Sequence, residues 1–504
     1  MHEGIERRRF GQWMGAAFVA AAMPKIAIAQ TSSPMDLTIA DAARRIREGS
    51  LTASAQVEAS LGRIAIYGTK LNAFISVFAD RARAEARVLD AEMRAGRSRG
   101  PLHGVVLSVK DNIDTAGERT TGGSPAYQMR VPVEDSPSIA RLRAAGAIII
   151  GKNNLNELAM SDGSQSFYGR VRNPWSLDRQ TGGSSSGSCA SVAAHLVTAA
   201  VGTDTGGSIR NPSAWCGTVG LKPTSGLVPN RGGLPLTPSL DTVGPITRTV
   251  EDAALMLGVM AGYDRLDITS EQHEPEDYVA QMRKPVAGLR VARLLGHFDR
   301  LEPDVAAAVE AAIGTISGLV GGSIGEASLP DGGRAMELMP FGETRAWYAD
   351  DLAAHRYLFS ELDRATLDAG ADVKAEDYIR ARWEMDLLRR TVNDSFASID
   401  LMLFPTIHVV APKLVQPGPP DPNGARAPGA LFDAGLINVL GLPAISVPCG
   451  FSREGLPIGL CIVGPRFGEG RILSLAHAYE QATAWHLRQP ALRPSTPVPP
   501  IPAA

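Results

Sequence analysis

Apolar residues recur every three or four positions in the first part of the chain, between Leu37 and Asp90. Val57, Leu61 and Ile64 follow this spacing, which places side chains on one face of a helix. We therefore predict that residues 37–90 are helical. The segment also contains residues that commonly cap helix N-termini, namely Thr38, Thr52 and Asp80.

Continuous apolar runs with β-branched residues follow this region. Gly104–Asp114 and Ala147–Ile150 predict buried strands, and a helical pattern lies between them at Ser138–Ala145. This order, with continuous apolar strands, is typical of a parallel α/β sheet. Asp400–Thr406 and Ala444–Pro448 predict further buried strands. Further helices are predicted over Glu251–Ala261, Pro303–Leu319 and Glu343–Phe396.

Two later segments show no periodicity. Ala411–Leu431 is rich in Pro and Gly, and so long a loop in a compact domain is either functional or mobile. It could edge a substrate entrance or be a plain surface loop. The tail from Pro490, residues 490–504, is rich in Pro and is predicted to be unstructured.

The N-terminal segment, residues 1–29, is predicted to lie outside the fold. Arg7–Phe10 reads R-R-x-F and precedes a short apolar stretch, Trp13–Ala22. Ala27–Ala29 fits an A-x-A cleavage site, so the mature chain would begin near Gln30. Paired arginines here indicate a twin-arginine export signal, with a periplasmic or secreted destination. The apolar stretch is too short to span a bilayer, so no stable membrane anchor is expected.

Composition and charge narrow the function class. The 504 residues are 44% hydrophobic and 20% charged, as in globular proteins. A formal net charge of −3 implies no surface for a polyanion, so nucleic acid is not an expected partner. The cysteines lack C-x-x-C and metal-ligand spacing, so we predict no metal and no cofactor. They are interpreted as small buried hydrophobes, although export would permit a disulfide: Cys189, Cys216, Cys449 and Cys461.

Two Gly/Ser turns frame the most distinctive stretch, Asp178–Arg210. The first turn is GGSSSG at 182–187, the second is Gly206–Ser208, and a small-residue, helix-compatible run, Ser188–Ala200, joins them. Glycines allow close backbone approach, and serines supply hydroxyls for nucleophilic attack or proton relay. Such clusters are often linkers, but apolar segments flank this one, and it lacks the G-x-x-x-x-G-K-[ST] phosphate-loop pattern. The stretch therefore favours a catalytic site.

A serine nucleophile needs a base within hydrogen-bond reach. His103 and His195 lie near the Gly/Ser stretch in sequence, and histidine is the usual base. Lys110 and Lys152 are the alternative, because both end apolar strands where burial lowers a lysine pKa. A fall from about 10.4 to about 7 corresponds to roughly 4 kcal/mol against the charged form. The residues alone leave both kinds of base open.

Three long motifs make the chain resemble the amidase-signature family of amide hydrolases. They are HGVVLSVKDNID at 103–114, NPWSLDRQTGGSSSGSCAS at 173–191 and GTDTGGSIRNPSAWCGTVGLKPT at 202–224. Shorter matches are NELAM at 156–160 and NVLGLPAISVP at 438–448, and the resemblance covers roughly Leu37–Ala484. It implies an α/β fold with one large domain over 30–489, in which helices cover both faces of a mixed central sheet. It also implies a small-molecule amide substrate and, because family members are often dimers, allows a homodimer.

Carried over by position, the family's Ser–Ser–Lys triad falls on Ser208 as nucleophile, Ser184 as proton relay and Lys110 as base. The family holds the relay serine through a cis peptide, here Gly183–Ser184. The expected reaction is acyl transfer to Ser208, release of ammonia or an amine, and hydrolysis of the acyl-enzyme. The second turn would aim backbone N–H groups at the developing oxyanion, from Thr205, Gly206 and Gly207.

Neighbouring positions depart modestly from the family pattern. Ser186 stands where a glycine is usual and Thr181 where proline is common, but neither change removes a catalytic group. Ser185 is a candidate helper hydroxyl. Asp204 and Arg210 could brace the second turn as an ion pair or lie on the surface. Two other lysines at family positions are interpreted as structural, Lys152 and Lys222.

The acyl pocket is expected to draw on Met160, Ser161, Tyr127 and Trp215. Trp347 or the Ala411–Leu431 loop would shape its mouth. Aromatic and apolar walls favour aryl or alkyl amides, although each of these side chains could equally belong to the core. The sequence does not define which amide is cleaved.

Three alternatives stay open. Residues 183–187 satisfy the G-x-S-x-G motif of α/β-hydrolases, with Ser185 as nucleophile and His408 as base, but no strand precedes them. The glutamine-hydrolysing subunit of a tRNA-dependent amidotransferase belongs to the same family. An export signal opposes that reading, and Leu431 falls where those subunits tend to carry an acidic residue. A binding module on an inactive scaffold would require loss of a triad residue, and all three are present.

Overall fold

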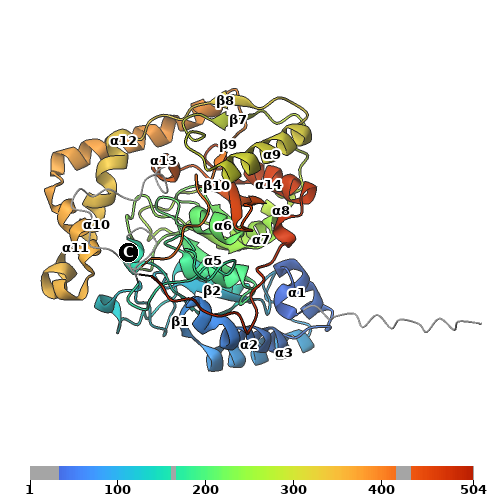
Figure 1. The fold of residues 1–504 in the computed structure, drawn as a ribbon. Helices are drawn as coiled ribbons and strands as arrows, with labels where there is room; N and C mark the ends of the chain where they lie inside the picture. Colours follow the sequence, from blue (N-terminus) through green and yellow to red (C-terminus); the bar gives the residue numbers. More distant parts are fainter. Residues whose placement is uncertain (1–32, 161–165, 416–432, 503–504) are drawn as a thin grey trace, which may run out of the picture. The chain divides into compact units, whose positions relative to one another are not determined.

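The computed structural model describes residues 33–160, 166–415 and 433–502. Eleven strands in these residues form one sheet, in the order β1-β3-β2-β4-β6-β5-β10-β11-β9-β7-β8 (Figure 1). The strands are β1 (Phe74–Val77), β2 (Val106–Lys110), β3 (Ile148–Asn153), β4 (Ala199–Thr203), β5 (Val219–Lys222), β6 (Val243–Thr247), β7 (Val291–Leu294), β8 (Gly325–Ala327), β9 (Leu401–Pro405), β10 (Ala444–Phe451) and β11 (Pro457–Val463).

Strand directions in the sheet are mixed. β2 runs parallel to both β3 and β4, and β7 runs parallel to β8 and β9. The other paired strands are antiparallel. The predicted strand–helix–strand unit is confirmed as β2, α4 (Pro137–Ala144) and β3. Because β2 and β4 are parallel, their last residues, Lys110 and Thr203, lie at the same edge of the sheet.

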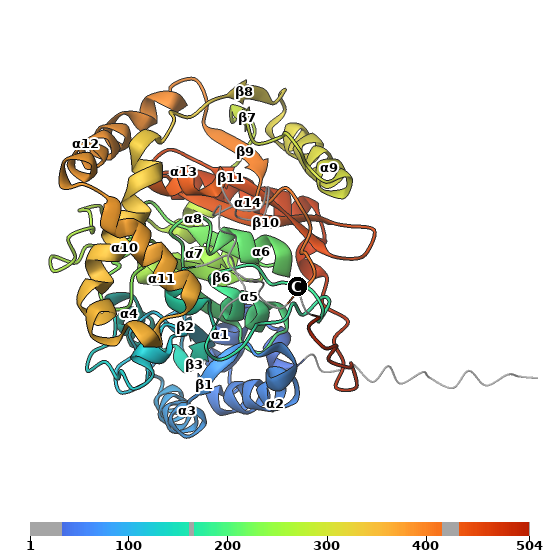
Figure 2. The same ribbon diagram turned by 60° about the vertical axis from the view of Figure 1, so that its left-hand side comes forward.

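Successive residues of the central strands face two different hydrophobic cores. Leu107 and Val109 belong to one core and Val106 to the other, as the alternation of side chains along a strand requires. The sheet therefore carries helices on both faces, as predicted (Figures 1 and 2). The first core is covered by α1 (Ile39–Arg47), α4, α7 (Val250–Met260), α8 (Tyr278–Met282), α9 (Pro303–Val320) and α14 (Glu469–Ala482). The second is covered by α2 (Ala53–Leu71), α3 (Ala79–Arg94) and α5 (Ser186–Ala193), with Cys216 of α6 (Arg210–Cys216).

Three further helices form an arm beside the sheet, gold and orange in Figure 2. They are α10 (Gly333–His355), α11 (Glu361–Ala369) and α12 (Ala375–Thr391). Met339 and Met385 of this arm pack with Leu240 and with Val439 of α13 (Asp433–Val439). The prediction of a long helical region is confirmed, although the region begins earlier, at Gly333. Single-turn 3-10 helices lie at Pro34–Asp36, Pro125–Tyr127, Glu157–Ala159, Arg356–Leu358, Gly370–Asp372, Val392–Phe396 and Trp485–Leu487.

Some of the predicted local structure is wrong. Thr38 and Thr52 do cap α1 and α2, but Asp80 lies inside the first turn of α3, which begins directly after Phe78. Phe74–Val77 is a strand within the stretch predicted as helical, because it pairs with β3. The helix-compatible run Ser188–Ala200 is helical only as far as Ala193, since Ala199 and Ala200 pair with neighbouring strands as the start of β4. Tertiary pairing overrides the local pattern at both places.

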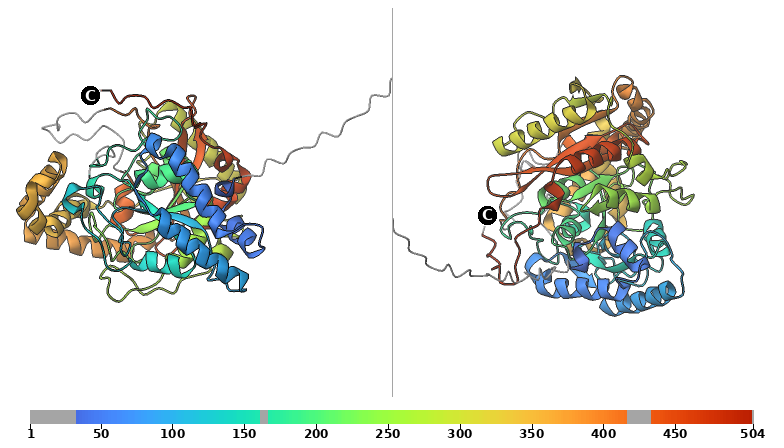
Figure 3. Two further views of the ribbon diagram at one scale, coloured as in Figure 1. Left: turned by 90° about the horizontal axis from the view of Figure 1, so that it is seen from below. Right: turned by 90° about the vertical axis from the view of Figure 1, so that its right-hand side faces the viewer.

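The C-terminal tail has no helix or strand from Pro490 to Pro502, as predicted, yet it is held against the protein. Lys70 Nζ of α2 donates to the Thr496 carbonyl at 2.6 Å, and Leu492 packs against the second core. Figures 1 and 3 show the dark red tail running along the outside of the fold to the C-terminus. The predicted export signal lies outside the described residues. Most of the Ala411–Leu431 loop, residues 416–431, lies outside them too. Before that gap, Ala411 is buried.

Candidate active site

The two Gly/Ser turns meet at the sheet edge where β2 and β4 end. The first turn leads into α5, and the second joins β4 to α6. Ser185 N donates to the Ser208 carbonyl at 3.2 Å, which joins the turns directly. The peptide between Gly183 and Ser184 is cis. The two turns, which are separate in sequence, thus lie next to each other in the structure.

Glycine is needed in both turns because neighbouring atoms leave no room for a side chain. A Cβ on Gly183 would lie 2.7 Å from the side-chain nitrogen of Asn156. Gly207 adopts a φ of +114°, and a Cβ there would lie 2.6 Å from the side-chain nitrogen of Asn211. The glycines therefore fix the path of the backbone around the two serines.

Lys110 ends β2 and is fully buried beneath these turns. Its Nζ donates to Ser184 Oγ at 2.8 Å and to Thr203 Oγ1 at 2.7 Å. Burial lowers the pKa of Lys110 to about 7, although Asp241 and Asp204 act in the opposite direction. Its nearest contacts are therefore hydroxyls, and a substantial neutral fraction exists near pH 7.

Thr203 and Asn112 are two polar residues at this site that the sequence reasoning did not single out. Asn112 Nδ2 donates to Thr203 Oγ1 at 3.3 Å and to the Leu234 carbonyl at 3.2 Å. Thr203 Oγ1 therefore accepts from both Asn112 and Lys110. The sequence did mark both positions, because each residue lies at or just beyond the end of an apolar strand.

The two histidines considered as bases do not contact Ser184 or Ser208. His103 Nε2 is 3.1 Å from the Leu89 carbonyl, and His195 Nδ1 is 2.9 Å from Asp36. Both histidines hold structural contacts between helices and loops. Of the bases weighed, Lys110 is the one for which the described residues show a hydrogen bond to a serine of the turns.

Asp204 and Arg210 form the ion pair considered for the second turn, and both are fully buried. The Arg210 guanidinium donates twice to the Asp204 carboxylate, at 2.9 and 3.0 Å. Asp204 also accepts from the backbone N–H groups of Gly207 and Ile209, at 2.8 and 3.1 Å. Burial alone would raise the pKa of Asp204, but Arg210 and these hydrogen bonds hold it below its ordinary value. A permanent carboxylate thus organises the turn that carries Ser208.

Ser208 is half-buried, and its hydroxyl makes no hydrogen bond within residues 33–160, 166–415 and 433–502. The three backbone N–H groups predicted to face an oxyanion are not equivalent. The N–H of Gly207 already donates to Asp204. Those of Thr205 and Gly206 have no hydrogen-bond partner among the described residues.

The predicted substrate-lining residues lie in different surroundings. Met160 is buried in an apolar cluster beneath the helical arm. Tyr127 is half-buried and donates its hydroxyl to Asp351. Trp215 donates Nε1 to the Val409 carbonyl at 2.9 Å, and its ring packs under Gly182 of the first turn. Ser161 lies outside the described residues.

Trp347 is half-exposed and lines a cavity of about 200 Å³ that reaches Thr203. Asn112 and Asp241 line the same cavity. Burial raises the pKa of Asp241 to about 6, and its carboxylate accepts a hydrogen bond from Thr205. The cavity thus connects the surface at Trp347 with the polar groups beside Lys110.

The remaining candidates hold the fold together. Ser185 Oγ donates to the Thr203 carbonyl at 3.1 Å rather than to a histidine. Lys152 and Lys222 donate to backbone carbonyls of Ile113 and Pro223. The four cysteines are buried and free, and burial raises the pKa of each thiol. Among the described residues no three His, Cys, Asp or Glu side chains form a metal-binding group.

Comparison with known proteins assigns the chain to a family. The Amidase family matches residues 55–473, so the chain belongs to the amidase family and is an amidase-signature enzyme. The A subunit of glutamyl-tRNA(Gln) amidotransferase from Roseiflexus sp. (strain RS-1) is 37% identical over 493 residues, 90% of this chain and 98% of the relative. The corresponding protein of Pseudomonas aeruginosa (strain PAO1) is 38% identical over 487 residues, 90% of this chain and 99% of the relative.

The fold agrees with that assignment. The native peptide amidase from Stenotrophomonas maltophilia superimposes with a TM-score of 0.78 at 32% sequence identity. The match covers 89% of this chain and 97% of that chain. The resemblance read from the three sequence motifs is confirmed, and so is the mixed sheet with helices on both faces.

Proposed function

We propose that the protein hydrolyses the C–N bond of a carboxylic amide through an acyl-enzyme on Ser208, with Ser184 as proton relay and Lys110 as base. One observation carries the proposal: a fully buried lysine whose pKa is lowered to about 7 lies 2.8 Å from Ser184 Oγ. Ser184 in turn belongs to the turn that is hydrogen-bonded to the turn of Ser208.

In the acylation step the proton moves from Ser208 through Ser184 to the Lys110 amine. When Lys110 is neutral, the same 2.8 Å contact lets Ser184 donate its proton to Nζ while Ser184 Oγ accepts the proton of Ser208. Ser208 Oγ then forms a bond to the amide carbonyl carbon. The proton returns through Ser184 to the leaving nitrogen, the C–N bond breaks, and ammonia or an amine departs. Water, activated by the same relay, hydrolyses the ester to the carboxylic acid and free Ser208.

The developing oxyanion would accept from the N–H groups of Thr205 and Gly206, which have no other partner among the described residues. The Gly207 N–H, bound to Asp204, would hold the turn in shape rather than face the substrate. Thr203 and Asn112 would keep Lys110 Nζ directed at Ser184.

The second candidate is the glutamine-hydrolysing function of the amidotransferase subunits, which is favoured by the names of the curated relatives at 37–38% identity. The two functions differ in substrate rather than in bond cleaved. We favour a free-standing amidase, because Arg7–Phe10 and Ala27–Ala29 together read as a twin-arginine export signal, whereas amidotransferases act on tRNA in the cytoplasm. Assays with aryl, alkyl and peptide amides would distinguish these substrate classes.

The test combines labelling with a substrate panel. Purified mature protein is treated with a fluorophosphonate, mapped by peptide mass spectrometry and compared with Ser208→Ala. The proposal expects an adduct on Ser208 that is absent from the variant, and ammonia or amine release from an aryl or alkyl amide. An adduct on Ser185 would instead make Ser185 the nucleophile and contradict the proposal, and turnover of glutamine alone would support the amidotransferase reading.

Export is a separate proposal with its own measurement. Cells that produce the full chain are fractionated, and the protein is compared with a variant in which Arg7 and Arg8 are both replaced by Lys. We expect mature protein beginning near Gln30 in the periplasm or medium, and precursor retained in the cytoplasm for the variant. Uncleaved full-length protein that stays in the cytoplasm in both cases would rule out the signal.

A further inference from the structure

A second polar cavity, of about 370 Å³, lies between the helical arm and the sheet. It is formed by α12 together with the loops that follow β5, α7 and β11. None of the three residues of the proposed catalytic relay lines it. Its most distinctive side chains are four arginines and two serines: Arg382, Arg389, Arg390, Arg466, Ser225 and Ser239.

Two of the four guanidinium groups already have a carboxylate partner. Arg466 pairs with Glu271, and Arg382 lies 3.3 Å from Asp386. The other two arginines make no ion pair within the part of the chain that the structure describes. The cavity therefore carries two positive charges that no neighbouring carboxylate contacts.

Arg389 is one of these two and is held by main-chain atoms alone. Its guanidinium donates to the carbonyls of Val439, Ser239 and Asn438, at 2.9, 2.8 and 3.0 Å. Burial, and then the neighbouring guanidiniums of Arg466 and Arg382, lower the pKa of Arg389 to about 10, against smaller opposing effects of Glu271 and Asp386. This repulsion between arginines would be relieved by an anion placed among them.

Asp241 is a third carboxylate at the cavity wall, but its oxygens have other partners. They accept from the backbone N–H groups of Leu236 and Thr237 at 2.9 and 3.3 Å, and from the hydroxyl of Thr205. Asp241 therefore does not neutralise the two unpaired arginines.

The cavity also presents donors without acceptors. The hydroxyls of Ser225 and Ser239 belong to side chains that are only 5% and 6% exposed, and neither has a hydrogen-bond partner in the described residues. Arg466 Nε is likewise buried without a partner there. Buried polar atoms are normally satisfied, so several such donors around one cavity indicate a missing acceptor.

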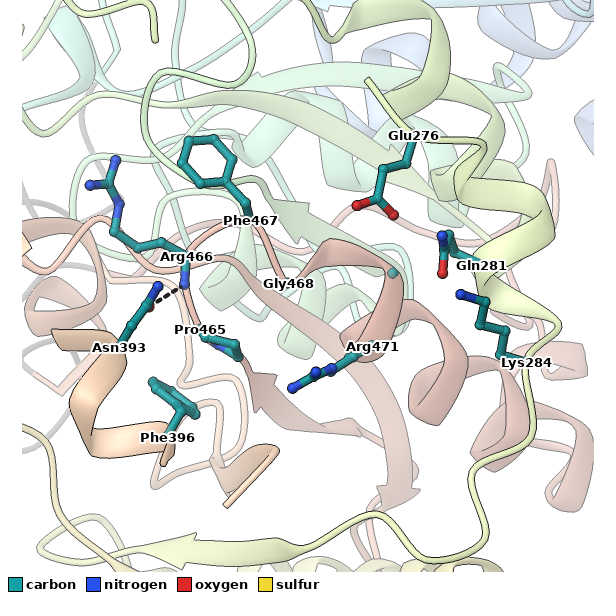
Figure 4. A pocket seen from close by; sticks show the side chains of 11 residues that line it. Glu276, Gln281, Lys284, Asn393, Phe396, Pro465, Arg466, Phe467, Gly468 and Arg471 are labelled. Atoms are coloured by element: carbon teal, nitrogen blue, oxygen red, sulfur yellow. Dashed lines mark hydrogen bonds between the residues drawn. The ribbon is translucent and has the colours of Figure 1, made fainter. Parts of the chain in front are cut away.

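A neighbouring groove, shown in Figure 4, gives a direct comparison. Lys284 and Arg471 line it, but Glu276 lies across from Lys284, and Arg471 pairs with Asp400 at 3.4 Å. Figure 4 shows the Arg466 guanidinium directed away from Lys284 and Arg471. Apart from Arg466, no described side chain of this groove has a buried donor without a partner.

We propose that the cavity between α12 and the sheet binds a small divalent oxyanion, a phosphate or a dicarboxylate. Arg389 and Arg390 supply the two charges, and the hydroxyls of Ser225 and Ser239 supply neutral donors. Guanidinium groups match the geometry of both carboxylate and phosphate oxygens. Two guanidinium groups without a direct ion pair match a dianion better than a monoanion.

The experiment is isothermal titration of the full-length protein with inorganic phosphate and, separately, with succinate, at constant ionic strength in sodium chloride. We expect saturable binding of at least one of the two at one site per chain. The tighter ligand distinguishes a phosphate from a dicarboxylate source. The titration needs no turnover, so its outcome is independent of the proposed amidase activity.

Variants locate the site. Arg390→Gln combined with Ser239→Ala should weaken binding at least tenfold, whereas Arg471→Gln, the same charge change in the neighbouring groove, should alter it less than twofold. Ser225→Ala, which removes a hydroxyl without a described partner, provides a second variant if the double variant lowers the melting temperature. Absence of saturable binding by both dianions, or equal weakening by Arg471→Gln, would overturn the proposal.

Discussion

Lys110 and Lys152 occupy neighbouring parallel strands, β2 and β3, close to the same sheet edge. Both are fully buried, and burial lowers the pKa of Lys110 to about 7 and that of Lys152 to about 8. Their partners differ. Lys110 Nζ contacts Ser184 in one of the two Gly/Ser turns, at 2.8 Å.

Lys152 instead contacts groups that hold the fold together. Its Nζ donates to the Ile113 carbonyl and to the hydroxyls of Thr115 and Thr120, at 3.2 and 3.0 Å. It also lies 3.9 Å from the buried carboxylate of Asp111. Lys152 therefore compensates a buried acid and fastens the loop after β2.

The comparison shows that a lowered pKa does not by itself define a catalytic base. Lys222 makes the same point, because burial lowers its pKa to about 7 and yet its hydrogen bond goes to the Pro223 carbonyl. What separates Lys110 is a hydroxyl partner in a turn that can reach a second serine. The following predictions test that distinction.

The largest expected effect is the loss of amide hydrolysis when Lys110 is replaced. Lys110→Met should lower kcat by at least about 10³-fold, because Ser184 loses the base to which it is hydrogen-bonded. Lys222→Met serves as the matched control and should keep kcat within about tenfold, after correction for the folded fraction. Steady-state hydrolysis of an amide identified in the panel measures both. Equal losses in the two variants would remove the distinction between the lysines.

For the free energy of unfolding, in contrast to activity, replacing Lys152 should be more harmful than replacing Lys110. Lys152→Met should destabilise the protein by about 2–4 kcal/mol, because Asp111 would be left as an uncompensated buried acid. Lys110→Met should stabilise it by about 1 kcal/mol or more at pH 6, since burial disfavours the charged amine. Denaturant unfolding measures both.

The pH dependence of that stability follows from the sign of the shift. Between about pH 7 and the ordinary lysine pKa of about 10.4, the unfolded chain binds more protons at Lys110 than the folded protein does. Wild-type stability therefore rises with pH in that window, and the advantage of Lys110→Met shrinks from pH 6 to pH 9. An advantage that grew with pH would contradict the lowered pKa.

Asp241→Asn should move the pH profile of kcat/KM. Asp241 is the largest of the charges that oppose the lowering of the Lys110 pKa. Its removal should shift the ascending limb to lower pH by about half a unit, while the amide oxygen can still accept from Thr205. Asp114→Asn, away from Lys110, provides the control, and a shift to higher pH for Asp241→Asn would refute the assignment of Lys110 to that limb.

Thr203→Val should lower kcat by about tenfold with little change in KM. The variant removes the hydroxyl that accepts from Lys110 Nζ at 2.7 Å, so the amine is held less well against Ser184. Thr203→Ser, which keeps the hydroxyl, should restore most of the rate. Failure of Thr203→Ser to differ from Thr203→Val would show that the methyl group, not the hydroxyl, matters.

The smallest effect is expected for Ser185→Ala, which should change kcat by less than about threefold. Ser185 Oγ donates to the Thr203 carbonyl at 3.1 Å and contacts no base. Loss of all activity in this variant, with Ser208→Ala still active, would reinstate Ser185 as the nucleophile.

Long motifs and apolar runs predicted much of this structure. The β2–α4–β3 unit follows from the sequence, because it depends on residues close together in the chain. The pairing of Asp204 with Arg210 was one of two alternatives that the sequence left open, and the structure shows the ion pair. The antiparallel strands were harder to predict, since β1 and β4 consist of short or small-residue segments that become strands only through their neighbours.

The contacts around Lys110 were also difficult to predict from the sequence. Lys110 donates to Thr203, and Asn112 also donates to Thr203. The positions of these residues at strand ends are visible in the sequence, but the contacts arise from packing of β2 against β4. Gly207 was expected to face the oxyanion, yet its N–H donates to Asp204. His103 and His195 looked suitable by sequence distance, but their rings contact the Leu89 carbonyl and the Asp36 carboxylate instead.

The rate at which a fluorophosphonate modifies Ser208, measured between pH 5 and pH 9, tests the central claim most directly. The account predicts a rate that rises with pH and an apparent pKa near 7, set by Lys110. That rise should persist in Lys222→Met and vanish in Lys110→Met. An unchanged profile in Lys110→Met would contradict the assignment of Lys110 as the base.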